Sequence, residues 1–170
     1  SSTLALGQNA KAVGDSSVAL GQNASATEIY SVALGRDASA GDSSVALGRR
    51  ARAWGFSVAL GYNALVVGDS SVAIGLGSTT ENAAVALGTN ASAGDNSVAL
   101  GKGVWAEGSY SVALGIGASA ENDNEGVLGD AGPYTTSTWI VPGDFTVSGT
   151  KNFEIPHPKP EKKATHVIRH

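Results

Sequence analysis

The chain is built on a repeat of 13 or 14 residues, which limits its possible folds more than any other feature. The letters SVALG stand at 17–21, 31–35, 44–48, 57–61, 97–101 and 111–115, with near copies between them. A fixed short period indicates a solenoid, in which one repeat cannot bury its apolar face without its neighbours. Such a repeat is too short for a helix pair or a propeller blade, but it suffices for two short strands and two turns. Each repeat closes its apolar stretch with a glycine: Gly7, Gly21, Gly35, Gly48, Gly61, Gly75, Gly88, Gly101, Gly115 and, in degraded form, Gly129.

Each repeat is predicted to form one coil of a β-roll with two strands. The first strand is SVALG, and the second is the A-x-A that follows, closed by a Gly-Asp or Gly-Ser turn. Period-two alternation places Val45 and Leu47 on one face of the first strand and Ala46 on the other. We therefore expect a flat core in which the large Val and Leu side chains meet the two small residues of the second strand, such as Ala38 and Ala40.

Two columns of residues are expected on the outside of the roll. The residue between the two small residues of the second strand changes freely along the chain: Lys11, Ser25, Ser39, Arg52, Leu65, Thr79, Ser92, Trp105 and Ser119. The residue between Val and Leu is instead always alanine. Small residues repeated on a face outside the core indicate close packing against a partner, most simply another copy of the chain. The predicted subunit interface is Ala19, Ala33, Ala46, Ala59, Ala73, Ala86, Ala99 and Ala113, with Ala5 at the start of the column.

Composition agrees with a thin, closely spaced core. Hydrophobic residues make up 42% of the chain but aromatic residues only 6%, and there are 23 glycines, which favours stacked sheets over a globular interior. The chain has no cysteine, so disulfides and thiolate metal sites are excluded. No apolar stretch is long enough to span a bilayer as a helix, and we predict neither membrane insertion within this segment nor nucleic-acid binding.

The pattern SVALGxxAxAxGxxSVALG, as in residues 31–48, resembles the head repeats of trimeric autotransporter adhesins of the YadA type. The resemblance covers residues 3–129, some three quarters of the chain. It implies an all-β fold, a left-handed parallel β-roll of about ten coils, assembled as a homotrimer. It also implies an extracellular, cell-surface location and attachment to a host glycan or matrix protein. The chain departs from the adhesins after the last repeat, where neither a heptad stalk nor a set of membrane strands follows.

Residues 130–170 are predicted to form a separate connector or trimerisation module after the roll at 1–129. Residues 1–150 carry a net charge of −7 and residues 151–170 a net charge of +3. The stretch TWIVPGDFTVSGTKNFEIPHP resembles segments near the C-termini of viral and phage fibres. A virion or phage tail fibre that binds a host receptor is therefore the alternative reading, and His170 is then either a processing point or an arbitrary boundary.

The strongest candidate for a ligand surface is the stretch GRRARAWGFSVALGYN, which concentrates positive charge and aromatic area in one coil. Threefold repetition would make it a multivalent patch for anionic glycans or matrix proteins. Pairing between coils is the alternative explanation, because stacking places Arg50 beside Asp37. Trp105, in the outward column, is a candidate for stacking on a glycan or simply a single exposed apolar residue. The ligand-surface candidates are Arg49, Arg50, Arg52, Trp54, Tyr62 and Trp105.

No catalytic or cofactor site is predicted. His166 and His170 have an i, i+4 spacing that could suit a metal in a trimer, but solvated terminal histidines are the better explanation, and the two residues are only weak metal candidates. The repeats contain no histidine, and their many Ser and Asp residues belong to turns. We therefore expect a structural and adhesive protein rather than an enzyme. The remaining alternatives are an ice-binding solenoid, which would need a regular Thr column, and a polysaccharide-degrading fibre enzyme, which would need a cleft with an acid and a base.

Overall fold

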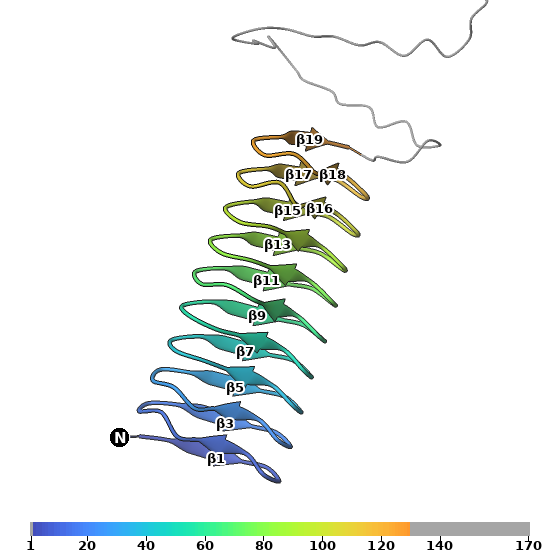
Figure 1. Ribbon diagram of the computed structural model, residues 1–170. Helices are drawn as coiled ribbons and strands as arrows, with labels where there is room; N and C mark the ends of the chain where they lie inside the picture. The colour runs from blue at the N-terminus through green and yellow to red at the C-terminus, as the bar shows by residue number, and fades with distance from the viewer. Residues whose placement is uncertain (1, 130–170) are drawn as a thin grey trace, which may run out of the picture. The chain divides into compact units, whose positions relative to one another are not determined.

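The computed structural model describes residues 2–129, and these form an all-β parallel solenoid (Figure 1). Successive strands alternate between two sheets, and within each sheet every strand pairs in parallel with the equivalent strand of the next coil. The ten strands of the first sheet and the nine of the second make nine complete coils and a final strand. The predicted all-β parallel solenoid is confirmed, and the predicted module at 130–170 lies outside the described residues.

The ten-stranded sheet contains the three-residue strands that begin at the Val of SVALG or its equivalent. They are β1 (Leu4–Leu6), β3 (Val18–Leu20), β5 (Val32–Leu34), β7 (Val45–Leu47), β9 (Val58–Leu60), β11 (Val72–Ile74), β13 (Val85–Leu87), β15 (Val98–Leu100), β17 (Val112–Leu114) and β19 (Gly126–Leu128).

The nine-stranded sheet contains the two-residue strands of the A-x-A stretches. They are β2 (Lys11–Ala12), β4 (Ser25–Ala26), β6 (Ser39–Ala40), β8 (Arg52–Ala53), β10 (Leu65–Val66), β12 (Thr79–Thr80), β14 (Ser92–Ala93), β16 (Trp105–Ala106) and β18 (Ser119–Ala120).

The register keeps each position of the repeat directly above the same position of the next coil. In β7 and β9, for example, Ala46 pairs with Ala59 and Leu47 pairs with Leu60. Backbone hydrogen bonds join the coils, such as the bond of 2.9 Å from the Val45 amide to the Ser57 carbonyl. Each coil therefore satisfies the backbone of its neighbours, and the positions of the repeat become columns along the solenoid.

The core is made mainly of alanine and serine rather than of the Val and Leu of the first strands. The central Ala of every strand of the ten-stranded sheet from β3 to β17 is fully buried. In the A-x-A stretches of the nine-stranded sheet, nearly all of the first and third residues are also buried. The Val and Leu side chains point the other way and stay partly exposed, with Leu47 at 37% and Leu60 at 36%. The prediction that Val45 and Leu47 lie in the core is therefore wrong. Alternation distinguishes two faces of a strand but does not say which face is inside. The narrow gap between these two sheets is filled mostly by alanine and serine, and its largest fully buried side chains are Val66, Val104 and Thr80.

The predicted alanine interface is wrong for the same reason. These side chains meet the alanines of the opposite sheet within one chain, with a relative exposure of 0%, so they offer no surface to a partner. Ala5, in the first coil, is exposed, but the correction applies to all the others: Ala19, Ala33, Ala46, Ala59, Ala73, Ala86, Ala99 and Ala113.

The Ser of SVALG is buried beside this alanine core and caps the adjacent turn. The Ser44 hydroxyl lies 2.8 Å from the Gly41 carbonyl and 3.0 Å from the Ala53 carbonyl. The Ser97 hydroxyl donates to the Gly108 carbonyl at 2.7 Å. A buried hydroxyl needs such partners, which explains why a polar residue recurs inside a core.

The Gly of VALG recurs because no side chain fits at this position. Gly61 has a φ of +139°, and a Cβ there would lie 2.4 Å from the Gly75 carbonyl oxygen of the next coil. Both the backbone conformation and the close approach of the coils exclude other residues. The same glycine therefore ends the first strand in every coil.

Candidate ligand surface

The coil that contains β8 places a strip of charged and aromatic side chains across the outer face of the nine-stranded sheet. Ala51 and Ala53 point into the core, so Arg52 and Trp54 point outward. Arg50 lies in the turn before β8, with a left-handed φ of 60°, and is also exposed. We call Arg50, Arg52 and Trp54 the arginine–tryptophan belt. The structure thus places three of the predicted surface candidates together on one coil.

The expected ion pair between Arg50 and Asp37 of the preceding coil does not form. Asp37 instead pairs with its neighbour Arg36 at 3.5 Å and accepts a hydrogen bond of 2.9 Å from the Asn23 side-chain amide. Within residues 2–129, no carboxylate lies within 4.0 Å of the Arg50 or Arg52 guanidinium. Both arginines therefore keep their charge available to a ligand.

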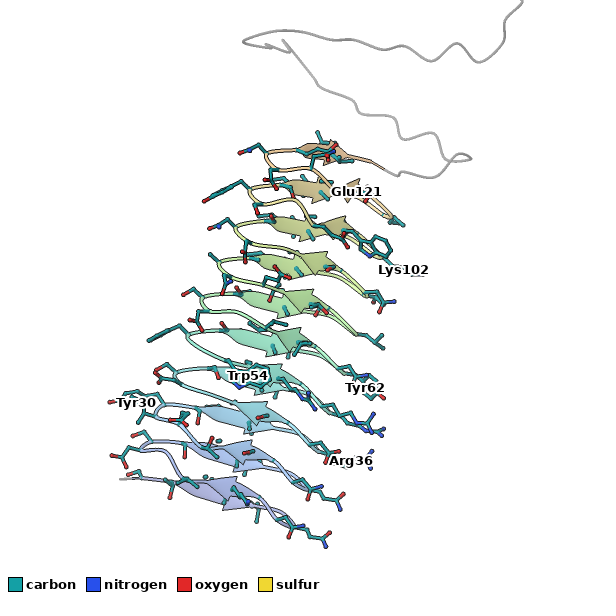
Figure 2. The ribbon with its side chains drawn as sticks, viewed as in Figure 1. Tyr30, Arg36, Trp54, Tyr62, Lys102 and Glu121 are labelled. Carbon is teal, nitrogen blue, oxygen red and sulfur yellow. The ribbon has the colours of Figure 1, made fainter. Side chains whose placement is uncertain are left out.

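Arg49 and Tyr62 lie along the turn edge of the solenoid rather than in the belt. The Arg49 guanidinium lies 5.4 Å from the centre of the Tyr62 ring, within the range of a cation–π contact. Figure 2 places Arg36, Tyr62 and Lys102 along this edge and Tyr30 along the opposite one. Cross-coil contact thus explains Arg49 and Tyr62, as the alternative prediction for these residues expected.

Trp54 is held in place by the coil below it. A Cβ added to Gly41 would lie 2.9 Å from Cδ1 of the indole, so the ring packs against the backbone at a position where only glycine leaves room. Trp54 is nevertheless 41% exposed. Between this coil and the next one, a shallow hollow is lined by Arg50, Arg52, Asn63 and Leu65. The belt therefore combines an anchored, partly exposed aromatic ring with two cations that line a shallow hollow.

Trp105 is exposed at 51% but lies apart from the belt. It belongs to β16, and its partners in register are Ser92 of β14 and Ser119 of β18. Neither neighbour carries a charge or a ring. The structure therefore confirms that Trp105 points outward, and its role as a glycan contact stays a prediction.

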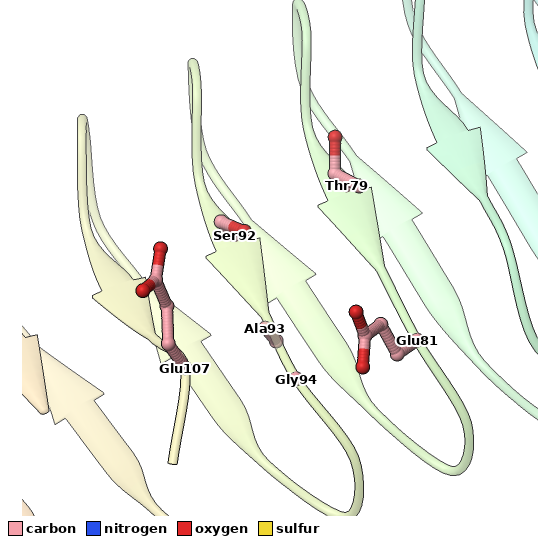
Figure 3. A pocket seen from close by; sticks show the side chains of 6 residues that line it. All are labelled: Thr79, Glu81, Ser92, Ala93, Gly94 and Glu107. Atoms are coloured by element: carbon pink, nitrogen blue, oxygen red, sulfur yellow. The ribbon is translucent and has the colours of Figure 1, made fainter. Parts of the chain in front are cut away.

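A second hollow on the outer face is acidic. It is lined by Thr79, Glu81, Ser92, Ala93, Gly94 and Glu107, and Figure 3 shows the two carboxylates on either side of the Gly94 coil. No group of three potential metal ligands occurs among residues 2–129, and this hollow offers only two carboxylates. The weak metal candidates His166 and His170 lie outside the described residues.

One carboxylate in the last coil has a shifted pKa. The Asn122 backbone N–H donates to Glu125 at 2.9 Å and, with the Asn122 side-chain amide, lowers the pKa of that carboxyl below its ordinary value. This contact closes a turn on the outside of the solenoid. No helix in the described part of the chain is long and apolar enough to cross a membrane.

The largest surface that sequence reasoning missed is the outer face of the ten-stranded sheet. We call it the Val–Leu face, made of the first and third residues of strands β3 to β17. The recurring Val and Leu positions are visible in the sequence, but the prediction placed their side chains inside the roll instead of on its outer face. The structure leaves them uncovered in a single chain.

Stacked parallel sheets with a 13- to 14-residue period define the class: a parallel β-solenoid built from short repeats. The chain belongs to the YadA head repeat family. The family model described as "YadA head domain repeat (2 copies)" matches residues 1–24, 12–38, 26–51, 56–78, 80–103 and 106–124, well over half of the chain. The chain is therefore an adhesin head segment of the kind displayed at the bacterial cell surface.

Among solved structures, the chain is similar to the collagen-binding domain of the Yersinia adhesin YadA. The two are 25% identical, with a TM-score of 0.49, and the match covers 84% of this chain and 77% of that one. A comparison with curated proteins finds no match.

Proposed function

We propose that this chain works as a homotrimeric head that attaches a bacterial surface fibre to a host glycan or matrix protein. Family membership supports an adhesive surface fibre, and this match gives no support to a viral or phage fibre. The subunit number and the host ligand are the proposal. The single observation that carries it is the uncovered Val–Leu face of the solenoid.

The Val–Leu face is a continuous apolar stripe on nearly every coil. Leu47, Leu60, Leu87 and Val112 remain 36–37% exposed in the single chain. Fully burying one such side chain contributes about 1.5–3 kcal/mol, so covering the exposed third contributes about 0.5–1 kcal/mol per residue. Repeated along the solenoid, this is enough to stabilise an assembly, whereas a stripe of this length left in water invites aggregation.

A copy of the same chain fits this stripe because it carries the same repeat. Equivalent positions recur at the strand spacing of about 4.8 Å in every copy, so the Val and Leu columns of neighbouring subunits can interdigitate along their whole length. Closed rotational symmetry covers the stripe on every subunit and leaves none exposed. The threefold number comes from the resemblance to the trimeric adhesins.

Attachment fits the described residues better than the alternatives. The outward column of the nine-stranded sheet contains Thr79 but no regular series of Thr, as an ice-binding face would need. The repeats contain no histidine, and the family to which the chain belongs consists of adhesin head repeats rather than polysaccharide-degrading enzymes. The outer face instead carries exposed arginine and tryptophan side chains suited to holding a ligand.

Molar mass in solution tests the proposal. Light scattering coupled to size exclusion is expected to give about three times the chain mass of 16.9 kDa. A stable, soluble monomer at micromolar concentration would refute the trimer, because the Val–Leu face would then be tolerated in water. Binding of the trimer to arrays of glycans and matrix proteins tests attachment, and a trimer that binds neither class would refute that part.

A further inference from the structure

We propose that the arginine–tryptophan belt binds an anionic polysaccharide. The inference rests on the proposed function and deepens it by naming the ligand class and the residues of the attachment surface. The belt lies on the outer face of the nine-stranded sheet, which is the face opposite the Val–Leu face. A trimer packed through the Val–Leu face displays three belts outward.

The two arginines of the belt supply the charge. Neither forms an ion pair with a carboxylate of residues 2–129, and both are exposed. A guanidinium binds a sulfate or a carboxylate through two parallel hydrogen bonds, with more geometric specificity than an ammonium group. Arg50, in the turn before β8, and Arg52, in β8, are two residues apart and line the same shallow hollow, so one polyanion can contact both guanidinium groups.

The charge of the solenoid restricts an anionic chain to this region. Four of the six Lys and Arg residues in 2–129 lie between positions 36 and 52. Between positions 66 and 129 there is one Lys against seven Asp and Glu. A polyanion is therefore attracted to the coils around β8 and repelled by the later coils.

The shape and the apolar groups of the belt favour a sugar chain over an acidic peptide. The Trp54 ring is fixed over Gly41 and presents a flat surface on which the C–H face of a sugar ring can stack. Leu65 adds an apolar wall to the hollow beside Arg50 and Arg52. Each strand of the nine-stranded sheet from β4 to β16 is paired with a neighbour on both sides. No strand edge in this region is therefore open to a peptide that would extend the sheet.

The test measures binding of the full chain to immobilised heparin, a sulfated polysaccharide, with unsulfated dextran as the neutral probe. The variants are Arg50→Gln/Arg52→Gln and Trp54→Ala. The control is Lys11→Gln/Lys102→Gln, which removes the same charge from exposed sites outside the belt. Circular dichroism and light scattering on every variant check that the fold and the mass are unchanged.

Wild type is expected to bind heparin and not dextran. Arg50→Gln/Arg52→Gln is expected to lose at least tenfold in affinity for heparin. The slope of log affinity against log salt concentration is expected to become about two smaller in magnitude, because two charge contacts are lost. Trp54→Ala is expected to lose about threefold in affinity for heparin, and the lysine control is expected to lose less than twofold. The site would be overturned if wild type did not bind, if the control lost as much as the arginine variant, or if poly-L-glutamate bound as tightly through the same arginines.

The two proposals fail separately. A trimer that does not bind heparin removes the polysaccharide site and leaves the proposed assembly standing. A monomer that binds one heparin site per chain, with the expected loss in Arg50→Gln/Arg52→Gln, removes the trimer and leaves the site standing.

Discussion

Two adjacent residues of β9 separate the solenoid core from the subunit interface. Ala59 is fully buried inside the chain, whereas Leu60 is 36% exposed on the Val–Leu face. Ala59→Glu places a carboxylate between sheets that only methyl groups fill, so overpacking and burial of the charge cost several kcal/mol. That is comparable with the whole stability of a domain, about 5–15 kcal/mol. We therefore expect Ala59→Glu to unfold the coils around β9.

Leu60→Glu is expected to leave the coil folded and to break the trimer. It removes about 0.5–1 kcal/mol of apolar burial from each subunit. It also brings three carboxylates together at a desolvated interface, which costs several kcal/mol more. Circular dichroism is expected to stay like that of wild type while light scattering reports a monomer.

Ser25→Glu is the matched control, because Ser25 lies in the outward column of the nine-stranded sheet, away from both core and interface. We expect this variant to keep the wild-type fold and mass. The assignment of the two faces is refuted if Leu60→Glu remains a trimer, or if Ala59→Glu is a folded monomer.

Three further predictions concern stability. Gly61→Ala is expected to lower the thermal midpoint strongly, because its Cβ would lie 2.4 Å from the Gly75 carbonyl, whereas Gly103→Ala, with nothing within 4 Å, is expected to cost only about 1 kcal/mol; equal losses contradict this. Tyr110→Asn is expected to stabilise the fold by about 1 kcal/mol in urea unfolding, because Tyr110 is exposed with a φ of 60° and asparagine tolerates that conformation; an unchanged midpoint argues against strain there. The lowered pKa of Glu125 means that its contact with Asn122 is complete above the ordinary glutamate pKa and is lost as the pH falls through the lower folded value. NMR titration is expected to give Glu125 a midpoint below the ordinary glutamate value. Asn122→Ala removes the side-chain amide but keeps the backbone N–H, so it is expected to raise that midpoint only in part; a midpoint at the ordinary value in wild type contradicts the contact.

The sequence predicted the architecture because the architecture is periodic. The recurring glycine sets the coil length, and the A-x-A stretch defines the outward column, so strands, register and the outward positions of Arg52 and Trp105 all follow from spacing. Period-two alternation also separated Val45 and Leu47 from Ala46 correctly. It could not decide which set is buried, because that depends on the distance between the sheets.

Residue size suggested the wrong answer at that point. Large aliphatic side chains usually fill cores, and this expectation placed Val and Leu inside. The recurring serines were a usable signal for the correct face. Ser44 and Ala46 lie on the same face of the strand, and both are small. A face that carries only small residues in every coil fits a narrow gap between two sheets. The candidate site was predicted as a group of residues, but the structure was needed to separate Arg49, which contacts Tyr62, from Arg50 and Arg52, which have no partner in the described chain.

The equivalence of the coils has a consequence for how such a fibre evolves. Because each coil contacts only the coils directly above and below it, duplication or deletion of one 13- or 14-residue unit keeps every column aligned and needs no new connection. Recombination between near-identical gene segments can therefore lengthen or shorten the head in single steps. The outward column lies outside the small-residue core, so a single codon change there alters the recognition surface while the scaffold is inherited intact.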